Sequence, residues 1–188
     1  MRSRRTVAKK AATRRPERVL ALDVSSVCVG YANLDGGQLG PHGRYHPEGK
    51  HHGEKLLSFH AWLSKTLIAF EPDQLIVETP YPGRRSSAYG VLSMYLGVVL
   101  SAYFAWAKQE LPDENRMPPN LVKQMLKVKK GATHDDRKVL MIKEINRRFG
   151  LRLVWKAGDK QKKVSQDDTA DAIAAGLAWF LKFRTVAA

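Results

Sequence analysis

Four acidic residues stand at positions where an isolated carboxylate is costly to bury. Asp23 and Glu78 each end a short apolar run, and Asp171 lies inside a longer one, a turn after Asp168. Residues three apart share a face of a helix, so Asp168 and Asp171 can point the same way. Converging carboxylates raise one another's pKa unless a cation lies between them. Because every donor is an oxygen, the set predicts a site for Mg²⁺, with Mn²⁺ as a substitute.

Each of the two acids that end an apolar run also has a plainer interpretation. Asp23 could accept hydrogen bonds from the two serines that follow it, as turn residues do. Glu78 could pair with Arg84 or Arg85. In an open α/β sheet, however, ligand sites form beyond the carboxyl ends of the strands, and both acids lie at such ends. We therefore expect both to be metal ligands.

The acids of the C-terminal helix divide into two kinds. Ser165 is a predicted N-cap, and Asp167 and Asp168 in the first turn would each favour the helix dipole by about 0.3–1 kcal/mol. Asp171 lies beyond the first turn among small apolar residues, so the dipole does not explain it. Asp167 is four residues from Asp171 and competes with Asp168 for the place beside it.

The charge of the chain indicates its partner. Its 188 residues carry a net charge of +14, with an isoelectric point near 10.0. A chain of this length suits one domain, and so basic a surface favours a polyanion, most commonly nucleic acid. Together with the four acids, this predicts phosphodiester hydrolysis with two ions per active site. One ion would activate water and the other would stabilise the leaving oxygen.

The distribution of charge along the chain predicts the domain boundaries. Residues 1–17 are basic and lack apolar periodicity, which predicts a disordered arm ahead of one domain at 18–188. The arm could bind phosphates without specificity, be a tail without a role, or be a targeting segment. The single Cys28 excludes internal disulfides and favours an intracellular, reducing compartment. No run reaches about 18 uninterrupted apolar residues, so we expect no membrane partner.

The hydrophobic pattern predicts an α/β fold with a mixed sheet covered by helices. A loop over 40–55 could hold a short edge strand. The other predicted strands are 18–24, 27–34, 74–78 and 151–155. The predicted helices are 54–70, 86–110, 118–126, 134–150 and 166–183.

The helix over 86–110 is too apolar to face open solvent on every side. Its small residues recur at spacings of three and four, which puts them near one face. They are Gly90, Ser93, Gly97 and Ser101. Such a face allows close packing against another helix, in this chain or in a second copy, and we expect a homodimer through it.

These motifs resemble, in order, the RuvC family of Holliday-junction resolvases in the RNase H-like superfamily. The resemblance rests on "RVLALDVSS…VGYANL", "PDQLIVETPY", "PPNLVKQML" and "DDTADAIAAGLA", and spans most of 18–183. It implies an RNase H-like mixed five-stranded sheet and Mg²⁺-dependent paired nicks in four-way or other branched DNA. The family's metal ligands match Asp23, Glu78, Asp168 and Asp171, and Lys123 matches a basic residue near its active site.

The resemblance also implies residues that contact DNA. Tyr81 falls where the family has an aromatic that stacks on bases, and either Arg137 or Lys138 matches a further basic residue. We expect the arginines after Glu78 and the basic loop before the helix at 134 to contribute phosphate contacts. These are Arg84, Arg85, Lys127, Lys129 and Lys130.

One departure from the family's pattern and several rival interpretations leave the function open. The family usually has Pro-Gly after its first Asp, whereas this chain has Val24 and Ser25. An RNase H-like nuclease acting on other branched DNA or on an RNA–DNA hybrid is one alternative. A non-catalytic nucleic-acid-binding protein with structural acids is another. His46, His51 and His52 form a weak candidate metal cluster, because they have no cysteine partners nearby.

Overall fold

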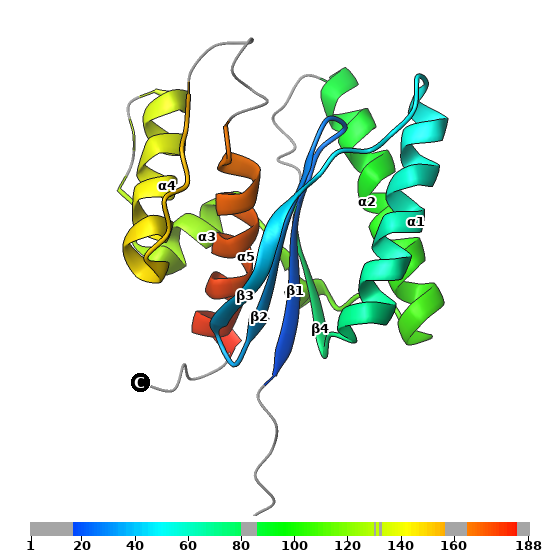
Figure 1. Ribbon diagram of the computed structural model, residues 1–188, viewed down its shortest axis with the longest axis horizontal. Helices are drawn as coiled ribbons and strands as arrows, with labels where there is room; N and C mark the ends of the chain where they lie inside the picture. Colours follow the sequence, from blue (N-terminus) through cyan, green and yellow to red (C-terminus); the bar gives the residue numbers. More distant parts are fainter. Residues whose placement is uncertain (1–16, 80–85, 130, 132, 157–164, 184–188) are drawn as a thin grey trace, which may run out of the picture.

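A five-stranded mixed sheet forms the centre of the molecule (Figure 1). The computed structural model describes residues 17–79, 86–129, 131, 133–156 and 165–183. The strand order is β3-β2-β1-β4-β5. β1 pairs antiparallel with β2 and parallel with β4, and β4 pairs parallel with β5. The strands are β1 (Arg18–Val24), β2 (Val29–Asp35), β3 (Gln38–Tyr45), β4 (Gln74–Glu78) and β5 (Arg116–Met117).

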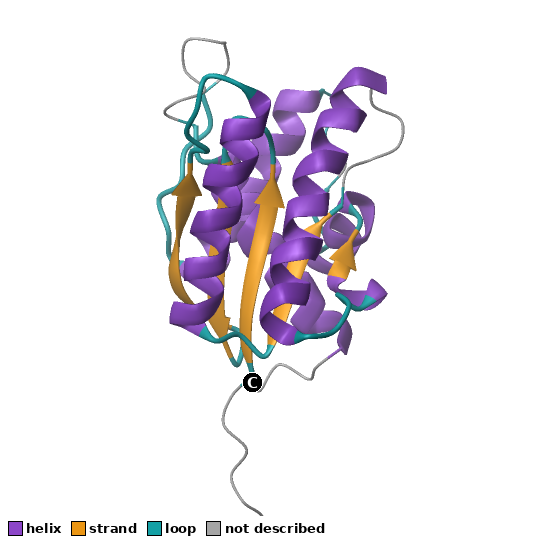
Figure 2. Ribbon diagram, turned by 90° about the vertical axis from the view of Figure 1, so that its right-hand side faces the viewer, coloured by secondary structure: helices purple, strands orange, loops and turns teal. Residues whose placement is uncertain are grey.

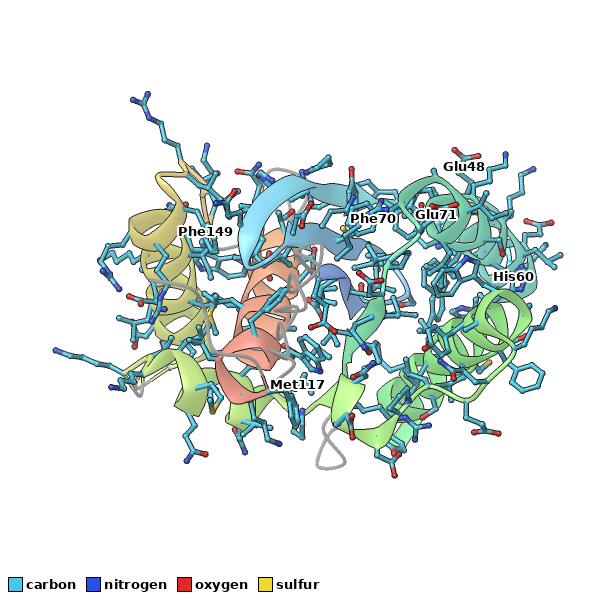
Figure 3. All side chains as sticks on the ribbon, turned by 90° about the horizontal axis from the view of Figure 1, so that it is seen from below. Glu48, His60, Phe70, Glu71, Met117 and Phe149 are labelled. Atoms are coloured by element: carbon cyan, nitrogen blue, oxygen red, sulfur yellow. The ribbon has the colours of Figure 1, made fainter. Side chains whose placement is uncertain are left out.

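Helices cover both faces of this sheet. One face carries α1 and α2, and the other carries α5 with α3 and α4 outside it (Figures 1 and 2). The view from below shows the two layers, with Phe70 on the α1 side and Met117 on the α5 side (Figure 3). The helices are α1 (His52–Phe70), α2 (Ser86–Ala107), α3 (Pro119–Leu126), α4 (His134–Phe149) and α5 (Asp167–Phe183). A short 3₁₀ turn, Asp113–Asn115, precedes β5. The predicted α/β class with five mixed strands is confirmed.

The C-terminal helix α5 forms the centre of one core. Every residue from Ala172 to Phe180 is buried. Its small side chains let the helix lie close to the sheet, and Gly176 sits so near Leu34 and Ala21 that a Cβ there would press against both. A run of Ala and Gly in a helix is thus explained by close packing against β1 and β2, and that contact fixes where the first turn of α5 lies.

The sheet has its fifth strand in a different place from the one predicted. Residues 151–156 form no strand, because side chains take up their backbone hydrogen bonds. Asn146 accepts from Leu153 N and donates to Leu153 O, both at 2.9 Å. The two-residue β5 after the 3₁₀ turn takes the edge position instead, and β3 is a full eight-residue strand.

One further sequence prediction was wrong. Helix α5 begins at Asp167, and the Ser165 hydroxyl, one residue too early to be the cap, has no hydrogen-bond partner among the described residues. Tyr89–Ala107, although interrupted by serines, is long and apolar enough to cross a membrane by length and composition alone. In this structure that segment packs on the core through Tyr95, Val99 and Tyr103.

Candidate active site

The two strand-end acids lie side by side at one edge of the sheet. Leu22 of β1 pairs with Val77 of β4, so the next residues on these parallel strands, Asp23 and Glu78, are neighbours. The chain folds this way because both strands are continuous apolar runs that a sheet covered on both faces buries. In Figure 1 this edge is the upper end, where α5 also begins.

The start of α5 is fixed against β2 and β3. Gly30 lies so close to it that a Cβ on this residue would overlap the backbone carbonyl of Asp168. The Thr169 hydroxyl donates to Gly43 O at 3.1 Å, and the Arg44 side chain donates to the Ser165 carbonyl. These contacts position the acids of the first turn over the end of the sheet.

Lys138 of α4 is the partner of the buried acid Asp171. Its ammonium lies 2.5 Å from Asp171 Oδ2 and 3.1 Å from Asp167 Oδ2. All three side chains are largely buried, at 23%, 14% and 15% exposure. The sequence interpretation gave Lys138 only a possible DNA contact, and it gave Asp167 a role at the helix dipole or as a rival of Asp168. In the structure, both residues belong to an ion-paired cluster with Asp171.

The charged forms of the remaining carboxyl groups are destabilised, which raises their pKa values. Burial, then the charge of Asp171, raises the pKa of Asp23 well above its usual range. Burial, then the charge of Asp23, does the same to the pKa of Glu78. The pKa of Asp168 is raised by burial and by Asp167. Burial opposes the charge of Lys138, but the attraction of Asp171, Asp23 and Asp167 outweighs it and raises the Lys138 pKa. One ammonium therefore does not neutralise the set.

This donor set fits a divalent cation. The donors are carboxylate oxygens, which Mg²⁺ and Mn²⁺ prefer, and a dication would offset both the burial and the mutual repulsion that raise three of their pKa values. Among the described residues, no three Asp, Glu, His or Cys side chains are already grouped closely enough to hold an ion. The three candidate histidines form no metal group within these residues either.

A cavity of about 760 Å³ opens above these acids. Asp23, Glu78 and the three aspartates of α5 line it, together with Lys138. Several further residues of its wall, to which the sequence interpretation gave no role in this site, come from five separate segments and share no motif. They are Cys28, His46, His134, Trp155 and Ser165.

A second hollow, of about 620 Å³, is lined by basic residues at α3 and the start of α4. Lys123 lines this hollow. Its charge also lowers the pKa of Glu78, which lines the cavity above the acids, against the larger effect of burial. Arg137 lines the hollow, whereas its neighbour Lys138 lines the cavity above the acids, which separates two residues that the sequence could not order. The predicted DNA-contact residues Lys127 and Lys129 line the basic hollow as well.

Four predicted DNA-contact residues lie outside the described part of the chain. They are Tyr81, Arg84, Arg85 and Lys130. The predicted arm lies outside it too, apart from Glu17.

Comparison with known proteins supports the fold. No protein-family model matches the chain, and no curated protein matches its sequence. A structure of Thermus thermophilus RuvC in complex with Holliday junction substrate is similar, with a TM-score of 0.64 and 19% identity over 88% of this chain and 95% of that one. Thermus thermophilus RuvC in a second structure gives a TM-score of 0.63, also at 19% identity and with the same coverage.

A eukaryotic protein has a similar structure. Ydc2, the yeast mitochondrial Holliday junction resolvase, gives a TM-score of 0.54 at 14% identity over 92% of this chain and 82% of that one. The resemblance that the motifs indicated is thus confirmed for the fold. Over most of its length, this chain has the fold of RuvC and Ydc2.

Proposed function

We propose that this protein is a metal-dependent endonuclease that resolves four-way DNA junctions by paired nicks. The observation that carries the proposal is the convergence of Asp23, Glu78, Asp168 and Asp171 at one edge of the sheet, where all four line one cavity. The fold supports it, because RuvC and Ydc2 share that fold and are Holliday-junction proteins. The basic hollow beside the acids supports it too.

The four carboxylates would hold two Mg²⁺ ions. When bound, such ions activate water for attack on phosphorus and stabilise the leaving oxygen. Asp23 and Glu78 hold their places because they extend from adjacent strands, and Asp168 and Asp171 because α5 is packed rigidly on the sheet. Asp167 keeps Lys138 beside the site.

The basic hollow would hold the backbone of a DNA arm. Lys123, Lys127, Lys129 and Arg137 all line it, and phosphate contacts from such residues position DNA without reading its sequence. Lys123 also acts on Glu78 through its charge, so the hollow and the acids are electrostatically linked.

We propose that the active unit is a homodimer through α2. The outer face of α2 exposes residues at alternating spacings of four and three, as in a coiled-coil seam. They are Gly90, Met94, Gly97, Ser101 and Phe104. Cβ atoms added at Gly90 and Gly97 would meet open space, so a second helix could approach closely. Two sites held in this way would nick two strands of one junction.

Sedimentation tests the dimer. Wild type should sediment at about twice the chain mass, and Gly97→Glu, which puts a charge on the seam, should be a monomer. Gly53→Glu is the matched control, because Gly53 lies at the start of α1 with open space around it. A wild-type protein that stays monomeric at micromolar concentration and still makes paired nicks would refute the dimer.

A substrate panel tests the function. Purified protein is mixed with labelled four-way junctions, flaps, linear duplex and an RNA–DNA hybrid, each with Mg²⁺ or with a chelator. The proposal expects paired nicks in the junction with Mg²⁺ alone. Preferential cutting of the hybrid or the flap would favour the alternative nucleases, and binding without any cutting would favour a non-catalytic protein.

A further inference from the structure

Two residues that line the cavity each carry a buried polar atom with no hydrogen-bond partner among the described residues. These atoms are Trp155 Nε1 and Ser165 Oγ. Ser165 is only 2% exposed. Buried donors and acceptors nearly always have partners in native proteins, because leaving one unpaired costs its full desolvation. Two such atoms on residues that line the same cavity therefore point to a ligand that completes them once the two side chains turn toward it.

The local structure makes these two residues neighbours. Val154 N donates to Gln166 Oε1 at 3.2 Å, and Gln166 N donates to Val154 O at 2.9 Å. The two bonds hold the segment after α4 beside the start of α5, so the adjoining residues Trp155 and Ser165 lie together. The bond from Arg44 to the Ser165 carbonyl fixes this segment to β3. The pair is therefore formed before any ligand binds.

The chemistry of the pair defines the ligand. An indole N–H can only donate, whereas a serine hydroxyl donates or accepts. The ligand must therefore offer an acceptor to Trp155 and a second polar atom to Ser165. Val27 and Leu92 give the same cavity apolar wall, and Val27 is 67% exposed. A flat group with a polar edge and apolar faces suits such a wall.

The charges nearby disfavour a phosphate bonded to Trp155 and Ser165, as distinct from the scissile phosphate at the proposed metal ions. Asp167 and Asp168 follow Ser165 by two and three residues and line the same cavity, so they would repel an anion. The cation in this wall, Lys138, is already held by Asp167 and Asp171. The basic residues that suit phosphate line the other hollow. A neutral nucleobase meets all of these conditions.

We propose that Trp155 and Ser165 form a base-reading subsite, which binds a nucleobase beside the cleaved phosphate through an acceptor on its edge. The proposal rests on the proposed function, because it needs DNA in the cavity. The two residues touch neither the reacting phosphorus nor the carboxylates in this role. They decide which junction sequences are cut, whereas the acids decide whether any is cut.

The test compares cleavage-site preference over junctions with a randomised core. Trp155→Phe keeps the ring and removes the donor, and Ser165→Ala removes the hydroxyl. Each variant should cut the preferred sequence about ten- to hundredfold more slowly, the usual range when one hydrogen bond to a base is removed, and cut other sequences at nearly the wild-type rate. Trp106→Phe is the control, because Trp106 packs on Tyr103 at the far end of α2.

A base analogue makes the test specific. Removing the acceptor atom from the preferred base should slow wild type by the same factor and slow Trp155→Phe no further. An unchanged base preference in both variants would overturn the proposal, and so would equal slowing at every sequence. If wild type cuts no junction at all, the proposed function fails instead, so the two failures are distinguishable.

Discussion

At the scale of single residues, the site is governed by an excess of negative charge. Asp171 has a partner in Lys138, but Asp23 and Glu78 are crowded by each other and by Asp171. Burial and these neighbours favour the protonated form of both groups. A site that holds such acids together in the absence of a metal must draw on the packing of the sheet and of α5 to do so.

Replacing one crowded acid should therefore stabilise the metal-free protein. Because the folded pKa of Asp23 lies above its unfolded value near 3.8, its charge destabilises the fold at neutral pH, and this cost disappears as the pH falls to about 4. Asp23→Asn should raise Tm at pH 7 by about 2–4 °C, the shift that 1 kcal/mol gives a domain of this size. Calorimetry in a chelator checks this.

The control for that experiment is the pH series itself. The difference in Tm between Asp23→Asn and wild type should shrink between pH 7 and pH 4, and Mg²⁺ should stabilise wild type more than the variant. A variant that is less stable than wild type at pH 7 would contradict the charge argument.

The two acids that open α5 should differ in function. Asp168 forms no ion pair with Lys138 among the described residues, whereas Asp167 bonds Lys138, which Asp171 also holds. Asp168→Asn should abolish Mg²⁺-dependent cleavage. Asp167→Asn should keep most activity and lose about 1 kcal/mol of stability at most. Single-turnover cleavage of a preformed junction complex measures the activity of both variants. An inactive Asp167→Asn beside an active Asp168→Asn would show that Asp167, and not Asp168, is the metal ligand.

At the scale of elements, the position of α5 sets the site. Its first turn lies on β2 only because Gly30 has no side chain, since a Cβ would overlap the Asp168 carbonyl. The small residues of its buried face bring the rest of the helix equally close to the sheet. The acids of α5 are thus held by backbone contacts and not by side chains alone.

Gly30→Ala should damage both stability and activity. The added methyl group must push α5 away, which costs about 1–3 kcal/mol of unfolding free energy. A displacement of about 1 Å at a catalytic group can lower the rate about a hundredfold. Thermal unfolding and cleavage rates measure the two effects. Gly53→Ala, in open space on α1, is the control and should be neutral or slightly stabilising. A Gly30→Ala variant with wild-type stability and a wild-type cleavage rate would contradict the inference that Gly30 sets the position of α5.

The same elements show what the sequence could predict. Continuous apolar runs and helical spacing located three strands and all five helices, because burial on a sheet imposes those patterns. The sequence misplaced the fifth strand, since nothing in 151–155 reveals that Asn146 takes its hydrogen bonds. Ion pairs such as Lys138 with Asp167 join residues about thirty apart, and residue types alone do not reveal which of two adjacent basic residues faces the cavity.

At the scale of the whole molecule, the charge is divided between the arm, the basic hollow and the acidic site. The arm over 1–16 holds seven basic residues and no acidic one. Glu17 already belongs to the fold, since its carbonyl accepts from Gly36 N at 2.9 Å. Deletion of residues 1–16 should therefore leave the domain intact.

That deletion should weaken binding to every DNA shape alike. The slope of log affinity against log salt falls by about 0.9 for each phosphate that the protein no longer neutralises, so the salt dependence should flatten. Titrations of junction and linear duplex at several salt concentrations measure this, and an arm with its basic residues changed to Gln is the control for length. Loss of junction preference with unchanged duplex binding would contradict the expectation, because charge alone does not read shape.

The most direct test of the account asks whether the strand-end acids perform the chemistry. Wild type, Asp23→Asn and Glu78→Gln are each bound to a labelled four-way junction, and cleavage is followed in a single turnover after Mg²⁺ is added. The account predicts that both variants bind the junction nearly as tightly as wild type and that neither cleaves it. Cleavage by either variant at the wild-type rate would contradict the central claim that the acids at the edge of the sheet form the active site.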